Sequence, residues 1–178
     1  MGSAPSLRYV WAMWEAARLR RRLRARPARS IEVSADTMRA AVALMLRYRP
    51  GPPALVLIRR AANPRDYWSG HLAFPGGFRH FGDRSLLATA RREVREELGY
   101  DLEKSGRLLG RLDDVAPVNR FGDFSVAVTP YVFELLGSPE FEPNEEVAEV
   151  LTPPLSHFLD PAQRSFVPHP ILQAPAAQ

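Results

Sequence analysis

The chain has 178 residues, of which 46% are apolar and 25% are charged, so it is long enough to bury a full core as one domain. No apolar run approaches membrane-spanning length, and the absence of cysteine excludes disulfides, thiolate catalysis and cysteine-ligated zinc. The formal net charge of +4 is uneven, because residues 1–30 carry +7 and residues 31–178 carry −3. The basic excess in this leader is therefore no argument for nucleic-acid binding by the folded domain.

Residues 8–26 suit a helix in which tryptophans precede an arginine run. A secretory signal has the reverse order, with its charges first, so we expect a cytoplasmic protein. We predict that residues 1–30 form a solvated helical extension whose tryptophans pack on the same domain or on a second copy in a homodimer. Attachment to an anionic surface and, in a eukaryotic source, a transit peptide stay open as alternatives.

A folded domain is predicted from residue 31 to residue 160. It begins with two apolar strands, at 40–48 and 55–60, joined by a hairpin connection rich in proline and glycine. A polar loop at 61–70 follows, and the chain then reaches a diglycine turn within the sequence FPGG.

The chain beyond residue 100 alternates apolar and polar segments. We predict a strand and loop at 106–118, a strand at 124–135, an acidic linker at 138–150 and a short helix at 155–160. Pro130 indicates that its strand lies at an edge or is bulged. The tail, residues 161–178, is rich in proline and alanine and is predicted to be loosely ordered.

The central feature of the sequence is a helix predicted over residues 85–98. At 100° per residue, one arc is apolar and would face a core; it contains Leu87, Ala90, Val94 and Leu98. The adjacent arc holds three carboxylates: Glu93, Glu96 and Glu97. Like charges one turn apart repel, and a divalent cation is the simplest way to turn that repulsion into attraction. Oxygen donors favour magnesium or manganese over zinc.

This helix and the loop before it resemble the Nudix box. The resemblance rests on Gly77, on Asp83 and on the block Arg92–Tyr100, REVREELGY. Asp83 replaces the first Glu of the family pattern, and eight residues rather than seven separate it from Arg92. Together with the FPGG sequence, this longer loop resembles the coenzyme A diphosphatase branch. The resemblance extends from about residue 40 to residue 160.

The resemblance implies an α/β fold, specifically a Nudix-type α/β/α sandwich with a mixed β-sheet and the box as a loop-helix-loop. It also implies a Mg2+-dependent (or Mn2+-dependent) pyrophosphohydrolase that cleaves a nucleoside diphosphate linked to another moiety. Coenzyme A is the leading candidate, with 3′,5′-ADP and 4′-phosphopantetheine as products. ADP-ribose, nucleotide sugars, dinucleoside polyphosphates and nucleoside triphosphates are rivals. A domain that binds a nucleotide without hydrolysing it is the alternative of another class.

The same resemblance assigns roles to individual residues. The metal would be held by the carboxylates of Glu93, Glu96 and Glu97 and by the Gly77 carbonyl. Arg92 would orient these carboxylates through charge-assisted hydrogen bonds. The general base would be Glu97 in the box, or Glu145 or Glu146 in the acidic segment, whose other interpretation is a solvated loop.

Three residues before the box are candidates for substrate binding. Arg59 and Arg60 end a predicted strand and suit bidentate contacts with phosphate, although an ordinary charged strand end explains them equally well. Trp68 suits stacking on a base, and loop packing is the alternative.

Overall fold

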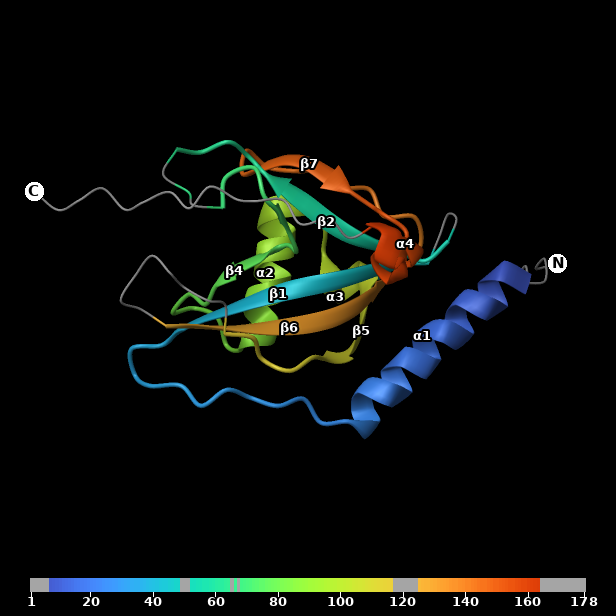
Figure 1. Cartoon of the computed structure of the whole chain (residues 1–178), viewed down its shortest axis with the longest axis horizontal. Coiled ribbons are helices and arrows are strands. Elements are labelled where there is room, and N and C mark those ends of the chain that lie inside the picture. Colours follow the sequence, from blue (N-terminus) through green and yellow to red (C-terminus); the bar gives the residue numbers. More distant parts are fainter. Residues whose placement is uncertain (1–6, 49–51, 65, 67, 117–124, 164–178) are drawn as a thin grey trace, which may run out of the picture.

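The computed structural model describes residues 7–48, 52–64, 66, 68–116 and 125–163. Within them a β-sheet is covered by helices on both faces (Figure 1). In chain order the elements are α1 (Leu7–Ala25), β1 (Met38–Arg47), β2 (Ala54–Arg60), β3 (Leu72–Ala73), β4 (Gly76–Phe78), α2 (Leu86–Leu98), α3 (Leu102–Ser105), β5 (Gly106–Arg111), β6 (Val126–Leu135), β7 (Val147–Leu151), α4 (Leu155–Leu159) and the 3-10 helix η1 (Pro161–Gln163).

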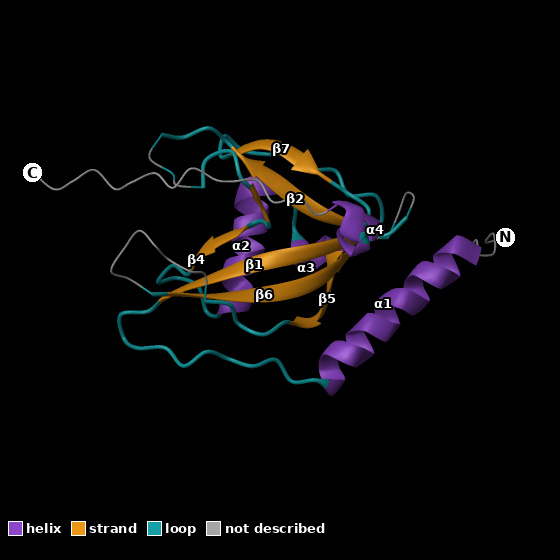
Figure 2. Ribbon diagram, viewed as in Figure 1, coloured by secondary structure: helices purple, strands orange, loops and turns teal. Residues whose placement is uncertain are grey.

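The sheet is mixed, as predicted. Its strand order is β3-β2-β1-β6-β5, with β4 paired to β1 and β7 paired to β2. The β1–β6 pair is parallel and the other pairs are antiparallel. Figure 2 shows the long strands β1 and β6 side by side at the centre of the sheet.

Side-chain alternation along the strands creates two apolar layers, one on each face of the sheet. In β1, Ala43 and Met45 pack with Val94 and Leu98 of α2. Leu46 points to the opposite face, in a cluster with partly buried residues of α1 at its rim. The sheet therefore separates α2 from α1, and the predicted α/β/α sandwich is confirmed.

Helix α1 packs on its own domain. Ala16 is 1% exposed, and Leu19 and Leu23 lie against the cluster around Leu109. A Cβ added at Gly110 would lie 2.8 Å from the Leu23 Cβ, so the missing side chain at this position lets the helix approach β5 closely. The tryptophan side chains of the leader lie outside the described residues. None of the described helices combines the length and apolar character of a membrane span.

Strand β6 is a central strand, because it pairs with β1 on one side and with β5 on the other. The prediction that Pro130 marks an edge is therefore wrong, and the register shift lies in β5, between Leu108 and Gly110. Proline lacks only the N–H donor, and the Pro130 carbonyl still accepts a hydrogen bond of 3.0 Å from Leu112 N–H. The regular β5–β6 pairing stops beside Pro130, where Arg111 faces Tyr131.

Two further segments differ from the prediction. The diglycine sequence belongs to strand β4, in which Gly76 pairs with Val42, and so it is not a turn. The end of the predicted acidic linker is strand β7, which runs antiparallel to β2 and buries Val147. Both strands are too short for sequence alternation to reveal, and they form because β1 and β2 offer unpaired backbone groups.

The remaining elements follow the sequence. The predicted strands at 40–48 and 55–60 and the helices at 8–26, 85–98 and 155–160 are confirmed within two residues at each end. In the loosely ordered tail predicted at 161–178, the first three residues form η1, and residues 164–178 lie outside the described residues. Residues 49–51 of the hairpin connection also lie outside them.

Candidate active site

Helix α2 is fixed at both ends by its own sequence. The Ser85 side chain caps the N-terminus by accepting a hydrogen bond of 3.1 Å from Ala88 N–H. At the C-terminus Gly99 adopts a φ of 63°, and its N–H donates to the Arg95 carbonyl. The apolar arc is buried, with Val94 and Leu98 inaccessible to solvent. The acidic arc is therefore held at a defined orientation beside the sheet.

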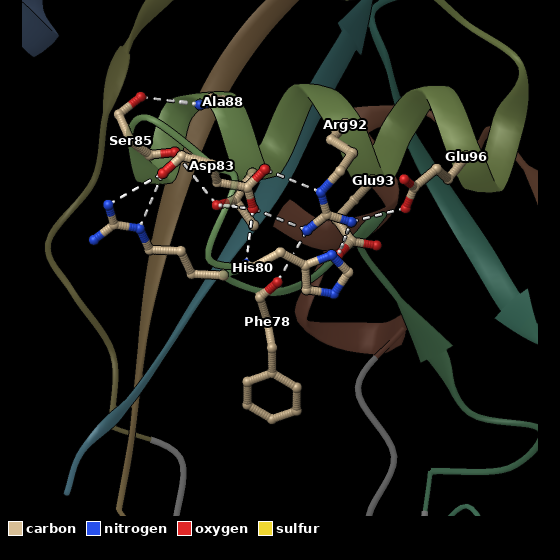
Figure 3. Close-up of polar contacts among 10 residues, drawn as sticks. Phe78, His80, Asp83, Ser85, Ala88, Arg92, Glu93 and Glu96 are labelled. Atoms are coloured by element: carbon tan, nitrogen blue, oxygen red, sulfur yellow. Dashed lines mark hydrogen bonds and ion pairs between the residues drawn. The ribbon is translucent and has the colours of Figure 1, made fainter.

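Arg92 is the centre of the polar network on α2 (Figure 3). Its guanidinium binds the Asp83 carboxylate through two hydrogen bonds, of 3.1 Å from Nε and 3.0 Å from Nη2. Its Nη1 lies 2.9 Å from Glu93 Oε1 and 2.7 Å from Glu96 Oε2, and Nη2 also donates to the Phe78 carbonyl at 3.0 Å. One arginine thus ties the preceding loop to two of the three box carboxylates.

Asp83 anchors this network from the loop. It also accepts hydrogen bonds from His80 N–H at 2.9 Å and from the Thr89 hydroxyl at 3.0 Å. The bond from Arg92, opposed in part by burial, holds the pKa of Asp83 well below its usual range. The sequence left open whether Asp83 caps the helix or pairs with the box arginine. Ser85 is the cap, and Asp83 pairs with Arg92.

The three box carboxylates lie at different depths. The Glu96 side chain is 52% exposed, whereas that of Glu93 is 13% exposed. Burial raises the pKa of Glu93, and the charge of Arg92 opposes that rise. These two groups face the same guanidinium, so Arg92 neutralises the repulsion that the sequence pattern predicted between them.

Glu97 is the most buried of the three, with 2% of its surface exposed. Its Oε2 accepts a hydrogen bond of 2.9 Å from Gly76 N–H on strand β4. Burial raises the pKa of Glu97 to about 8, although the Gly76 hydrogen bond works in the opposite direction. Burial of this kind favours the protonated carboxyl group over the charged carboxylate. A cation beside Glu97 would reverse that preference, because its positive charge stabilises the carboxylate.

Strand β4 passes so close to these carboxylates that its first two positions, Gly76 and Gly77, have no room for a side chain. Gly76 has a φ of 155°, and a Cβ there would overlap the Ala41 carbonyl. A Cβ on Gly77 would overlap the carboxylate of Glu93. The two glycines therefore allow a polar backbone to line a cradle of carboxylate oxygens.

The donor set of this cradle fits a hard divalent cation, because it consists of carboxylate and backbone oxygens. Among the described residues, however, no three acidic or histidine side chains are gathered closely enough to hold an ion as they stand. The reason lies in the contacts above: Arg92 occupies Glu93 and Glu96, and Gly76 occupies Glu97. A bound cation would compete with Arg92 for Glu93 Oε1 and Glu96 Oε2, whereas the other oxygen of either carboxylate takes no part in these two contacts.

A cleft of about 400 Å3 lies between the end of β2 with the loop that follows it and the acidic segment before β7. Its polar lining consists of Arg60, Asn63, Asp66, Glu145 and Glu146. Arg60 donates from Nε to the Asp66 carboxylate at 2.7 Å. Beyond burial and the Gly76 hydrogen bond, the charges of Glu93, Arg60 and Glu146 also act on the Glu97 pKa, which places the cleft and the box in one electrostatic environment.

Two predicted substrate contacts lie outside the cleft lining. Arg59 pairs with Glu149 of β7 at 3.1 Å and is partly exposed. Trp68 is 56% exposed and stands edge-on to His71, with ring centroids 5.7 Å apart. The Trp68 N–H donates to Asp66 Oδ1 at 3.0 Å, so the loop that carries the ring is tied to the partner of Arg60.

The sequence arguments missed two residues of the site. Asp66 fixes the head of Arg60, and Thr89 donates to the anchor Asp83. Neither residue belongs to the box pattern. Asp66 accepts from the N–H two residues ahead, a turn that Asp forms in many loops, so nothing in the local sequence distinguishes it.

The profile of the NUDIX domain matches residues 37–170. The chain belongs to the NUDIX family. A relative from Photorhabdus laumondii, named "Uncharacterized Nudix hydrolase NudL", is 37% identical over 141 residues, which span 74% of this chain and 71% of the relative. A protein of the same name from Pectobacterium atrosepticum is 40% identical over 104 residues, 58% of this chain and 50% of that one. A protein from Schizosaccharomyces pombe is 38% identical over 112 residues, 61% of this chain but 34% of its own length.

Solved structures share the fold. An Ap4A hydrolase from C. elegans superposes with a TM-score of 0.58 at 15% identity, covering 69% of this chain and 84% of the enzyme. The NUDIX domain of Shewanella oneidensis NrtR, solved with ADP ribose, gives a TM-score of 0.56 at 20% identity, covering 71% and 78%. The family predicted from the sequence is confirmed by the domain match and by the Photorhabdus relative, and the solved structures show that the fold is shared. Hydrolases of this family act on nucleoside diphosphate derivatives and use divalent metal ions.

Proposed function

We propose that the protein is a divalent-metal-dependent pyrophosphohydrolase that cleaves a nucleoside diphosphate linked to another moiety. The observation that carries this proposal is the arrangement on α2. Glu93, Glu96 and the buried Glu97 project from one helix, on a frame set by Arg92 and beside the two glycines of β4, and the charges of the cleft residues Arg60 and Glu146 act on Glu97. A diphosphate in the cleft would bring its negative charge to the cation that these carboxylates hold.

The proposed metal is Mg2+ or Mn2+, held by Glu93, Glu96, Glu97 and the Gly77 carbonyl. When bound, it would neutralise the diphosphate and make a water molecule more acidic. Arg92, anchored by its bonds to Asp83 and to the Phe78 carbonyl, would position the carboxylates without touching the substrate.

The residues of the chain also supply candidates for proton transfer. Glu97 has a pKa raised by burial to about 8, so it holds a proton near neutral pH in the metal-free protein and releases it when a cation arrives. Glu146 lines the cleft and acts electrostatically on Glu97, which makes it the alternative base. Proton uptake from water by one of these two carboxylates is the acid-base step that the proposal requires.

The leading substrate is coenzyme A or one of its derivatives, cleaved to 3′,5′-ADP and 4′-phosphopantetheine. This assignment is supported by the FPGG sequence, by the longer loop to Asp83 and by Arg60, which stands where the branch has an arginine. Arg60 would leave Asp66 to bind a phosphate in the cleft, through the fork geometry of its guanidinium. Arg59 and Trp68 stay proposed as outer contacts for the larger part of the substrate.

A panel of substrates tests the proposal. The purified chain would be incubated with Mg2+ or with EDTA and offered coenzyme A, ADP-ribose, a nucleotide sugar, a dinucleoside polyphosphate and a nucleoside triphosphate, with products resolved by chromatography. We expect metal-dependent cleavage of a diphosphate bond, fastest with coenzyme A. A preference for ADP-ribose would overturn the substrate assignment alone.

Failure to turn over any of these substrates would contradict the hydrolase proposal. In that case, metal-independent binding of ADP-ribose by the intact chain would favour the non-hydrolytic nucleotide-binding domain. The proposal also includes a cytoplasmic location, as the order of charges in the leader predicted, and a small-molecule substrate in place of nucleic acid.

A further inference from the structure

The face of the sheet opposite α2 carries a second cavity, lined by basic and apolar side chains, that the hydrolase site does not use. It has a volume of about 330 Å3 and lies between α1 and the strands β5 and β6. Four arginines line it, against one glutamate; they are Arg20, Arg21, Arg24 and Arg107, with Glu134. The lining thus carries a formal charge of +3, in a cavity within the size range of small-molecule sites.

The single carboxylate of the cavity is already paired. Glu134 accepts a hydrogen bond of 3.1 Å from Arg107 Nη1, and its side chain is 9% exposed. Glu134 belongs to β6, next to Val132 and Phe133, whose side chains lie in the two opposite apolar layers. This pair therefore forms the floor of the cavity and leaves the arginines of α1 without a counter-charge.

The arginines on the helical wall lack partners within the described residues. Arg20 and Arg24 stand one helical turn apart, and neither has an ion pair or a side-chain hydrogen bond there. The Nε atom of Arg20 is buried with no hydrogen-bond acceptor. A buried N–H without a partner is costly, and like charges one turn apart repel, so an anionic partner would relieve both costs.

We propose that this cavity binds a small anion that carries two or more phosphate groups. Guanidinium groups bind phosphate oxygens through paired, charge-assisted hydrogen bonds, and a bound phosphate would supply the acceptor that Arg20 Nε lacks. Arg20 and Arg24 lie one helical turn apart on the same wall, and their long side chains would let each guanidinium bind one of two linked phosphates. The sheet separates this site from the box, so the inference does not depend on the proposed hydrolase function.

The same helix offers a matched control. Arg18 and Arg22 are also one turn apart, but they line a different cavity on the other flank of α1, with Leu46 and Tyr48. Exchanging Arg18 and Arg22 for glutamine changes the net charge as much as exchanging Arg20 and Arg24, and in addition removes the ion pair of Arg18 with Glu15. The two double variants therefore separate a local site from a general attraction between anions and a basic helix.

The probe is inorganic pyrophosphate, titrated by calorimetry into the full chain in EDTA so that metal-dependent binding at the box is removed. We expect one bound pyrophosphate per chain, and binding weaker by about tenfold or more in R20Q/R24Q. R18Q/R22Q and Arg60→Ser, which removes the arginine of the cleft, should bind as the intact chain does. Single-residue R24Q, at an exposed position, should show a smaller loss and serves if the double variant melts early.

Other results would overturn the proposal. Equal losses in R20Q/R24Q and R18Q/R22Q would show attraction to the helix charge alone, and a loss confined to Arg60→Ser would place the pyrophosphate in the cleft. Absence of binding by the intact chain would also contradict it. Vesicles of phosphatidylserine distinguish a lipid source: binding to vesicles without binding of pyrophosphate would assign the basic helix to a membrane surface.

Discussion

The two faces of the sheet handle charge in opposite ways. On the α2 face, Arg92 contacts three carboxylates, and Asp83 holds it through paired hydrogen bonds. On the α1 face, Arg20 and Arg24 have no carboxylate partner within the described residues. On α2 the paired charges fix the orientation of the carboxylates. On α1 the unpaired positive charges favour the binding of an anion. Orientation is therefore the role expected of arginine on α2, and anion attraction is its role on α1.

Removing the Arg92 contacts on α2 should have the largest effect on both turnover and stability. Arg92→Ala leaves the buried Asp83 without its counter-charge and lets Glu93 and Glu96 repel. We expect turnover to fall by about 1000-fold and the free energy of unfolding by about 3 kcal/mol. Initial rates with Mg2+ and urea denaturation measure the two effects.

The control for Arg92 lies one turn away on the same helix. Arg95→Ala removes a largely exposed pair with Asp101, whose shortest distance is 3.4 Å. It should change stability by less than about 1 kcal/mol and leave turnover unchanged. Equal effects of the two substitutions would contradict the special position of Arg92.

The burial of Glu97 predicts a pH dependence of stability in the metal-free protein. Its pKa rises from 4.5 in the unfolded chain to about 8 in the folded one, so the folded state binds more protons between these values. Stability should therefore fall as the pH rises from 4.5 to 8, with the part due to Glu97 below about 5 kcal/mol. Urea denaturation in EDTA at pH 5 and pH 8 should show a shallower fall for Glu97→Gln. The same fall in both proteins would contradict the raised pKa.

The docking of α1 can be loosened without touching the site. Gly110→Ala places a Cβ against Leu23, and overpacking of this kind costs about 1 to 3 kcal/mol. We expect a lower free energy of unfolding and faster proteolysis of residues 26–31, with turnover preserved. A loss of turnover equal to that of Arg92→Ala would show that the two faces are coupled.

Removing the unpaired charge from α1 should have the smallest effect on stability, and the opposite sign. R20Q/R24Q relieves two repulsive pairs, Arg20–Arg24 and Arg21–Arg24, and should raise the free energy of unfolding by about 0.4 to 1 kcal/mol in low salt. Thermal melts with and without 0.5 M salt would check this, because screening should abolish the gain. A clear destabilisation would contradict the absence of favourable partners for these arginines.

The sequence predicted the elements whose signal is local. The apolar period and the Ser85 cap define α2, and the box residues gave the family before any contact was known. The depth of the three carboxylates was not predictable in this way, because it depends on strand β4. Glu97 lies beside the apolar arc on a helical wheel, and in the fold it is buried with its carboxylate on the Gly76 N–H of β4.

The sequence predictions that were wrong or incomplete concern residues whose roles depend on contacts with segments that are distant in sequence or that belong to no recognisable pattern. Strands β4 and β7 depend on hydrogen bonds to β1 and β2, which are distant in sequence. Pro130 indicated an edge strand or a bulge, and no local pattern reveals that its strand has partners on both sides. Asp66 likewise has a role only because Arg60 lies beside it. Pairwise contacts of this kind come from the fold, and a single sequence contains no direct record of them.

The most direct test of the central claim is the turnover of Glu97→Gln, measured on the substrate that the intact protein cleaves fastest in Mg2+. Gln keeps the shape of the side chain but removes the charge that would hold a cation. Glu103→Gln, which removes an exposed partner of Arg91, is the control. The account predicts a loss of at least about 100-fold for Glu97→Gln with an unchanged fold, and no loss for Glu103→Gln. Full activity of Glu97→Gln would contradict the assignment of the α2 carboxylates as the reactive centre.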